Sequence, residues 1–166
     1  MTRQFDKANV SDGMKSILYE FPEIFLKPSG EVEELFGRYG NNKSPSVCVK
    51  REDLCNLRYG FEHGDGWAEV VKGFCKDMVA FLFRAKAAGK DLDYKSFIMK
   101  EKFGEFTPQG TLSGKDRREF SDEYWDIIEK WAAKSRQICE KTGKKGKLTK
   151  GKNGWIKTLC PEEFKK

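Results

Sequence analysis

The most constraining feature of this sequence is a run of apolar residues at three- and four-residue steps directly after Gly64-Asp65-Gly66. That spacing places apolar side chains on one face of an α-helix. The stripe consists of Trp67, Val70, Val71, Phe74, Met78, Phe81, Leu82 and Ala85. Asp65 can cap the first turn, and Gly89 can end the last one. The sequence therefore predicts a long amphipathic helix that must bury one face.

A second amphipathic helix is predicted to begin at Ser121, with Asp122 and Glu123 near the positive end of its dipole. Gly143 is expected to end this helix. Its stripe consists of Phe120, Tyr124, Ile127, Ile128, Trp131, Ser135 and Ile138. A shorter apolar run covers residues 14–26, where Pro22 ends or kinks a helix, and residues 31–40 are a short helix candidate.

Residues with high strand propensity between Asp93 and Phe106 predict one or two strands, with a turn at Gly104 or at 108–110. Residues 107–118 are predicted to be a polar loop, and a short strand is predicted at 46–50. The tail predicts a β-hairpin with strands at 146–149 and 155–159. We expect an α+β fold in which two long amphipathic helices pack with short strands and this C-terminal hairpin.

The chain has 166 residues, the size of one domain, and its 13 Phe, 5 Tyr and 4 Trp supply core volume. We expect a single domain over 1–166, with a core of helices and strands at 14–120 and a helix plus a basic hairpin at 121–166. The net charge is +6, and residues 130–166 alone hold 12 Lys and Arg against 3 Glu. This end is expected to attract phosphates or an acidic protein surface.

The cysteines and the termini indicate a reducing cytoplasm. Five cysteines is an odd number, and none has C-x-x-C spacing, which disfavours a disulfide scaffold. They are Cys48, Cys55, Cys75, Cys139 and Cys160. No signal peptide follows Met1 and no apolar run reaches the length of a membrane span, so we expect no membrane partner.

Seven lysines without an intervening acid form the candidate binding surface, and Trp155 offers a stacking face within it. They are Lys141, Lys144, Lys145, Lys147, Lys150, Lys152 and Lys157. One interpretation is a surface that follows nucleic-acid phosphates while a base stacks on the indole. The other is a solvated hairpin that lysine keeps soluble. Both stay open at this point.

Two other groups of residues are candidates for chemistry. Glu62, His63 and Asp65 could form a catalytic or metal site, but His63 is the sole histidine and no serine or cysteine stands at nucleophile spacing. A zinc ribbon would need a second ligand near both Cys139 and Cys160. The companion positions hold Thr142 and Glu163 instead. We therefore predict no catalytic residue, no bound metal and no cofactor.

Taken in order, five motifs resemble a family of small proteins encoded by bacteriophages and prophages. They are E-F-P-E-I-F at 20–25, G-F-E-H-G-D-G-W at 60–67, M-K-E-K-F-G at 99–104, R-Q-I-C-E at 136–140 and G-W-I-K-T-L-C at 154–160. Family members usually read C-E-x-C-G and T-L-C-x-x-H, which looks like a treble-clef or ribbon-type zinc site, and they often have Cys where His63 stands.

This resemblance implies a degenerate zinc-ribbon-like hairpin, which we expect to be held by packing of Trp155, Ile156 and Leu159 onto the 120–141 helix. It also implies a phage setting and a place in the host cytoplasm. The first functional hypothesis is a non-enzymatic phage accessory protein that binds and inhibits a host defence complex, as anti-CRISPR proteins do. The alternative is a nucleic-acid-binding module that contacts DNA or RNA through the lysine-rich hairpin.

Overall fold

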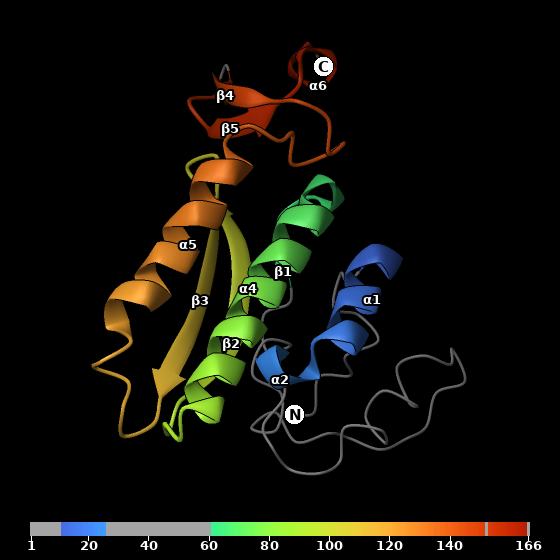
Figure 1. The fold of residues 1–166 in the computed structure, drawn as a ribbon. Coiled ribbons are helices and arrows are strands. Elements are labelled where there is room, and N and C mark those ends of the chain that lie inside the picture. The colour runs from blue at the N-terminus through green and yellow to red at the C-terminus, as the bar shows by residue number, and fades with distance from the viewer. Residues whose placement is uncertain (1–10, 26–60, 152, 166) are drawn as a thin grey trace, which may run out of the picture.

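The computed structural model describes residues 11–25, 61–151 and 153–165, which form a mixed α+β fold (Figure 1). In chain order the elements are α1 (Asp12–Glu20), α2 (Pro22–Phe25), β1 (Phe61–Glu62), η4 (Asp65–Trp67), α4 (Ala68–Ala87), β2 (Asp93–Lys102), β3 (Glu105–Ser113), α5 (Ser121–Ser135), β4 (Lys147–Lys150), β5 (Ile156–Leu159) and α6 (Pro161–Phe164). The helix candidate at 31–40 and the strand predicted at 46–50 lie outside the described residues. None of the described helices combines the length and hydropathy that crossing a bilayer requires.

The helix predicted after Gly66 is confirmed as α4, which is 20 residues long. Seven residues of its predicted stripe are buried and Leu82 is partly buried. Asp65 is not the cap, because Gly64 precedes the first turn and Asp65 lies within it. At the other end Gly89 has φ +72°, and the Lys90 N–H donates to the Ala85 carbonyl, which closes the helix as predicted.

The N-terminal run divides at Pro22 into α1 and α2, as its sequence predicts. Ser11 caps α1 by accepting a hydrogen bond from the Met14 N–H at 3.3 Å. Ile17 and Phe21 join the core, and so does Ile24 from α2. These two short helices therefore extend the core that α4 begins.

A three-stranded sheet holds β1 parallel to β2, and β2 antiparallel to β3. The pairing of Lys102 with Glu105 leaves only Phe103 and Gly104 in the turn, at φ +54° and +81°. Two successive positive φ values are the signature of a type I′ turn, whose twist matches that of the flanking strands. Of the two predicted turn positions, the structure has the one at Gly104.

The loop predicted at 107–118 is wrong for 107–113, because β3 continues to Ser113 as an edge strand. In this register the nitrogen of Pro108 points away from β2, so the missing N–H removes no ladder bond. The Phe106 N–H faces the same way and donates to the Ser135 hydroxyl at 2.8 Å. The end of α5 thus occupies part of the free edge of β3 and limits pairing with another chain.

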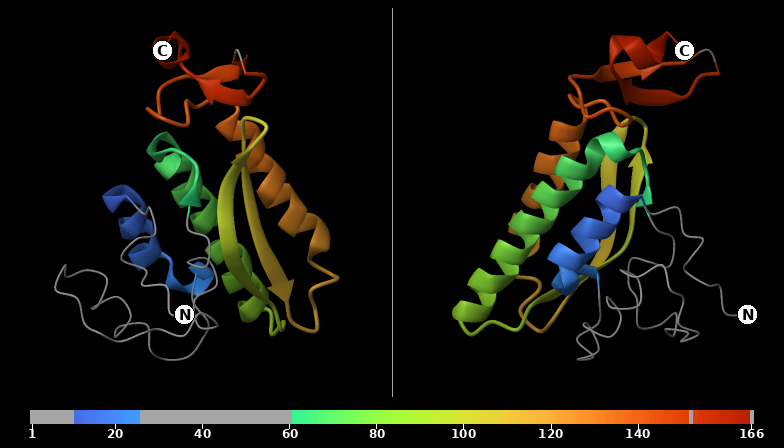
Figure 2. Two further views of the ribbon diagram at one scale, coloured as in Figure 1. Left: turned by 180° about the vertical axis from the view of Figure 1, so that it is seen from behind. Right: turned by 90° about the vertical axis from the view of Figure 1, so that its right-hand side faces the viewer.

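The second predicted helix begins at Ser121 but stops at Ser135, after 15 residues, so its expected continuation to Gly143 is wrong. Only α4 is long among the described helices. The buried Ser135 hydroxyl donates to the Ala132 carbonyl at 2.6 Å while it accepts from Phe106. Ile138 then bridges to Lys145, which leads into the hairpin. The helices α4 and α5 lie on one face of the sheet, and the hairpin and α6 lie at one end (Figure 2).

Close packing between α4 and α5 predicts opposite effects for two helical glycines. A Cβ at Gly73 would enter the Trp131 ring, whereas a Cβ at Gly13 would approach only the Ser11 hydroxyl, at 3.9 Å. Gly73→Ala should lower the free energy of unfolding by about 1–3 kcal/mol through overpacking. Gly13→Ala should raise it by about 0.5–1 kcal/mol, because alanine favours the helix. Urea denaturation measures both, and a stabilised Gly73→Ala protein would contradict this packing.

Candidate functional site

The C-terminal hairpin is confirmed as β4 paired antiparallel with β5. Lys147 lies opposite Leu159, and Lys150 lies opposite Ile156. Because directly paired residues share a face, Leu148, Lys150, Ile156 and Thr158 point to one side of the hairpin. The Gly151 N–H donates to the Trp155 carbonyl at 2.9 Å and closes the turn.

A largely buried ion-pair network fixes this hairpin to the core. The Lys157 ammonium lies 2.8 Å from a carboxylate oxygen of Glu101 and 2.8 Å from one of Glu140. The two carboxyl side chains are only 10% and 6% exposed. Burial alone would lower the pKa of Lys157, but the hydrogen bonds to both carboxylates raise it above its usual value. The network joins β5 to β2 and to the chain after α5.

Hydrogen bonds to Thr158 complete the attachment. Its hydroxyl donates to the Gly104 carbonyl at 2.6 Å, and its own carbonyl accepts from the Glu140 N–H at 3.0 Å. The expected apolar anchoring onto the 120–141 helix is wrong for Trp155 and Ile156, which are 68% and 38% exposed. Polar bonds along β5 hold the hairpin, so its outer surface stays open.

The fold divides the predicted lysines into two groups. Lys157 is part of the buried network, Lys144 pairs with Glu162 at 2.8 Å, and Lys141 approaches Glu163 at 3.4 Å. Of the seven predicted lysines, three are exposed and form no ion pair in the described part of the chain, and Lys152 lies outside that part. The three are Lys145, Lys147 and Lys150. With the exposed Trp155 they make up the candidate site, which we call the hairpin lysine surface. It includes both faces of the hairpin, because Lys147 and Lys150 point to opposite sides.

Sequence reasoning missed a group of exposed apolar residues beside these lysines. Phe103, in the β2–β3 turn, is 71% exposed, and Leu148 and Ile156 on the hairpin are 48% and 38% exposed. A Cβ on Gly104 would collide with the Leu148 side chain and lie 3.4 Å from Ile156. The turn and the hairpin therefore meet. The available signal was the K-F-G motif, which places an aromatic residue where hairpin turns favour Asn or Asp.

The structure places the His63 ring among aromatic rings. Its ring centroid lies 5.8 Å from those of Phe61 and Trp67. Burial lowers the pKa of His63, which keeps the imidazole neutral at neutral pH. Both carboxylates of this segment are exposed to solvent. The three candidate catalytic groups are thus not brought into one pocket.

Cys139 and Cys160 lie close together under the loop that follows α5. The Thr142 hydroxyl lies 3.6 Å from the Cys160 sulfur. Burial raises the pKa of Cys139, but the Thr142 hydroxyl and the backbone N–H groups of Cys160, Thr142 and Lys141 outweigh it and lower the pKa to about 7. The Thr142 hydroxyl and these backbone N–H groups therefore surround the two sulfur atoms.

The residues around Cys139 and Cys160 do not fit the zinc site of the family that the motifs resemble. Thr142 directs a hydroxyl at the sulfur, and the Glu163 carboxylate lies 3.4 Å from the Lys141 ammonium. Within the described ranges, no three His, Cys, Asp or Glu residues are arranged to hold a metal ion.

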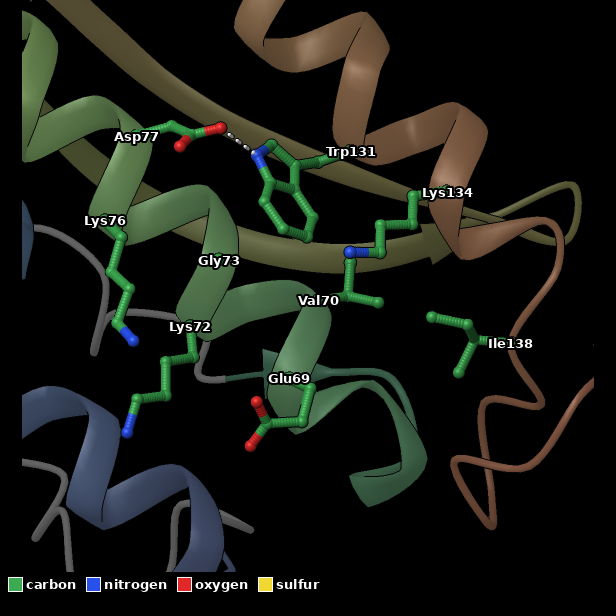
Figure 3. A pocket seen from close by; sticks show the side chains of 9 residues that line it. All are labelled: Glu69, Val70, Lys72, Gly73, Lys76, Asp77, Trp131, Lys134 and Ile138. Atoms are coloured by element: carbon green, nitrogen blue, oxygen red, sulfur yellow. Dashed lines mark hydrogen bonds between the residues drawn. The ribbon is translucent and has the colours of Figure 1, made fainter.

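A pocket of about 300 Å³ lies between α4 and α5 (Figure 3). The Trp131 indole N–H in its wall donates to Asp77 at 2.8 Å, and the Lys134 ammonium lies 4.6 Å from the centre of the Trp131 ring. Burial raises the pKa of Asp77, but hydrogen bonds from Lys130 and Trp131 outweigh it and lower the pKa. The polar groups of Asp77, Lys130 and Trp131 are therefore joined by hydrogen bonds. The residues lining the pocket include no Ser, Cys or His.

No family model, curated protein or solved structure matches this chain. The candidate site is therefore defined by geometry. It combines exposed lysines, exposed aromatic and aliphatic side chains, and a rigid attachment to the core.

The Cys139 environment predicts a pH-dependent thiol. Its pKa of about 7 lies below the ordinary value of 9.0, so the stability it contributes is fully present above pH 9.0 and is lost as pH falls through 7. Thr142→Val should raise this pKa and flatten the rise of unfolding free energy between those values. Thiolate absorbance during a pH titration measures the pKa, with Cys139→Ser as the control. An unshifted titration in Thr142→Val would contradict the hydroxyl's role.

The network around Lys157 predicts a large loss of stability when the cation is removed. Lys157→Met leaves the Glu101 and Glu140 carboxylates without their ammonium partner and with little access to solvent. It should lower the free energy of unfolding by about 2–4 kcal/mol. Lys147→Met, on the same hairpin, should change it by less than about 0.5 kcal/mol. Adding Glu140→Gln to Lys157→Met should recover part of the loss. Equal denaturation midpoints for the two lysine variants would refute the anchoring role.

Proposed function

We propose that this chain is a non-enzymatic phage accessory protein that binds a host defence complex of the CRISPR-effector type in the host cytoplasm and inhibits it. The observation that carries the proposal is the hairpin lysine surface, in which Lys145, Lys147 and Lys150 are exposed and unpaired within the described part of the chain. The phage setting comes from the motif resemblance. The degenerate zinc-ribbon-like character of the hairpin belongs to the same proposal.

The distribution of charge supports a binding role. Unpaired ammonium groups on a fixed backbone raise the association rate with an acidic surface. Lys144 and Glu162 form an ion pair that is more than 60% exposed on both sides, so a partner can displace it at little cost. Occupying an effector surface in this way would deny access to nucleic acid or to a recruited nuclease.

Nucleic-acid binding is the second candidate function, and the exposure of Trp155 favours it. An indole that is 68% exposed next to lysines can stack on a base while the ammonium groups contact phosphates. Lysine, however, lacks the planar donor fork with which arginine holds a phosphate, and none of the three unpaired cations is an arginine. We therefore place this function second.

A phage-plating assay tests the proposed function. In host cells with an active CRISPR system, expression of the protein should restore plaques of a targeted phage. Changing Lys145, Lys147 and Lys150 together to Glu should abolish this protection. A control variant with Lys76, Lys86 and Lys115 changed to Glu has the same net charge, and should protect fully because these exposed lysines lie on other elements.

Two results would count against the proposal. Wild-type protein that leaves plating unchanged would remove the defence complex as the partner. Equal loss in both triple variants would show that total charge matters and the hairpin does not. Fluorescence polarisation with single-stranded and duplex oligonucleotides at low salt tests nucleic-acid binding, the second candidate function. That function requires the wild-type protein to bind an oligonucleotide and the hairpin triple variant to lose this binding.

A further inference from the structure

Phe103 has a backbone conformation that its side chain disfavours. It is the one non-glycine residue of the described chain with positive φ, at +54°, in the first central position of the β2–β3 turn. Asn, Asp or Gly adopts that conformation at lower cost, whereas a bulky aromatic residue is strained there. The ring is also 71% exposed, so its burial does not compensate the strain. The fold itself gives no reason for phenylalanine at this position.

Strain of this kind is retained where it serves a function. The surroundings of Phe103 indicate which function. Leu148 and Ile156 both lie against the adjacent Gly104, so two exposed aliphatic side chains lie beside the turn that carries Phe103. We call Phe103, Leu148 and Ile156 the turn–hairpin patch. Two of its members are aliphatic and cannot stack on bases as an aromatic ring does.

The margin of this patch is cationic. The Lys102 ammonium lies 5.6 Å from the centre of the Phe103 ring. Lys150 is directly opposite Ile156 and shares its face of the hairpin. The nearby carboxylates of Glu101 and Glu140 are buried against Lys157 and do not neutralise this margin. An apolar centre with a charged margin is the usual anatomy of a protein–protein interface.

We propose that the turn–hairpin patch is a docking site for an acidic protein segment in which apolar side chains alternate with carboxylates. This inference rests on the proposed function and specifies the chemistry of the partner. Phe103 enters an apolar contact at the centre, and Lys102 and Lys150 pair with flanking carboxylates. The partner surface excludes water from the ring, which makes Phe103 the residue most sensitive to truncation.

Hydrogen bonds to the turn make the patch a preformed site. The Thr158 hydroxyl holds the Gly104 carbonyl at 2.6 Å, and the Glu101 carboxylate accepts from the Gly104 N–H at 2.6 Å. The two peptide units that flank the Gly104 Cα are therefore both fixed by side-chain hydrogen bonds. A preformed site loses little conformational entropy on binding, so a small patch can contribute measurable affinity.

Direct binding of two matched peptides tests this proposal. The first labelled peptide alternates Leu and Phe with Asp and Glu, and the second replaces each Leu and Phe by Ser at the same charge. Purified full-length protein should bind the first at least about tenfold more tightly than the second, measured by fluorescence polarisation. A single-stranded oligothymidylate is the third probe. Binding of this oligonucleotide through Phe103 would show that the patch stacks on bases.

Three variants make the test specific. Phe103→Asn suits the left-handed turn, so its melting temperature should equal or exceed that of the wild type while the peptide preference disappears. Leu148→Thr keeps strand propensity and should reduce the preference. Phe83→Gln is the matched control, because Phe83 on α4 is also 71% exposed and lies outside the patch. It should keep the full preference.

The proposal is overturned if wild-type protein binds both peptides equally, or if Phe103→Asn keeps the preference. It is also overturned if the oligonucleotide binds more tightly than either peptide and Phe103→Asn abolishes that binding, which would make the patch a nucleic-acid surface. Peptide preference without phage protection would contradict the proposed function alone. Phage protection that survives Phe103→Asn, together with no peptide preference, would contradict only the patch.

Discussion

The contact of one ammonium group with two carboxylates determines how the C-terminal part of this protein can act. Lys157 connects Glu101 of β2 and Glu140 of the chain after α5 to the hairpin, and both carboxyl side chains are nearly excluded from solvent. A carboxylate in such a position is costly without its cation, so the hairpin cannot separate from the body without a large penalty. What composition alone describes as a basic tail is a fixed surface of the folded domain.

That contact also changes what the lysine-rich sequence means. Counted along the chain, the lysines have no acid between them, yet folding brings Glu101, Glu140, Glu162 and Glu163 close to several of them. The positive potential is therefore smaller than the count suggests and is concentrated at Lys145, Lys147 and Lys150. A confined charge next to exposed apolar side chains suits a defined partner surface better than a uniform phosphate chain.

Sequence reasoning succeeded where a pattern is long and self-contained. The stripe of α4 repeats over five turns, and the two-strand tail is marked by glycines, so both were predictable. It failed where a distant partner decides the outcome. Ser135 fits the helical stripe, but its hydroxyl accepts a hydrogen bond from the Phe106 N–H in β3, and the helix ends there. Residues 107–113 look polar because β3 is an edge strand that needs no continuous apolar pattern.

The residues of the candidate site likewise differ in how far the sequence predicts them. Lysines are visible in any sequence, whereas Phe103 becomes informative only once the turn is placed at 103–104 and shown to face the hairpin. The position admits Asn at lower conformational cost, so a sequence optimised for folding alone would not keep an exposed aromatic ring there. The strain and the exposure both disfavour phenylalanine at this position, and a partner that covered the ring would regain only the apolar burial that the fold does not provide. A stable, preformed support from Thr158 and Glu101 is what allows the turn to tolerate both.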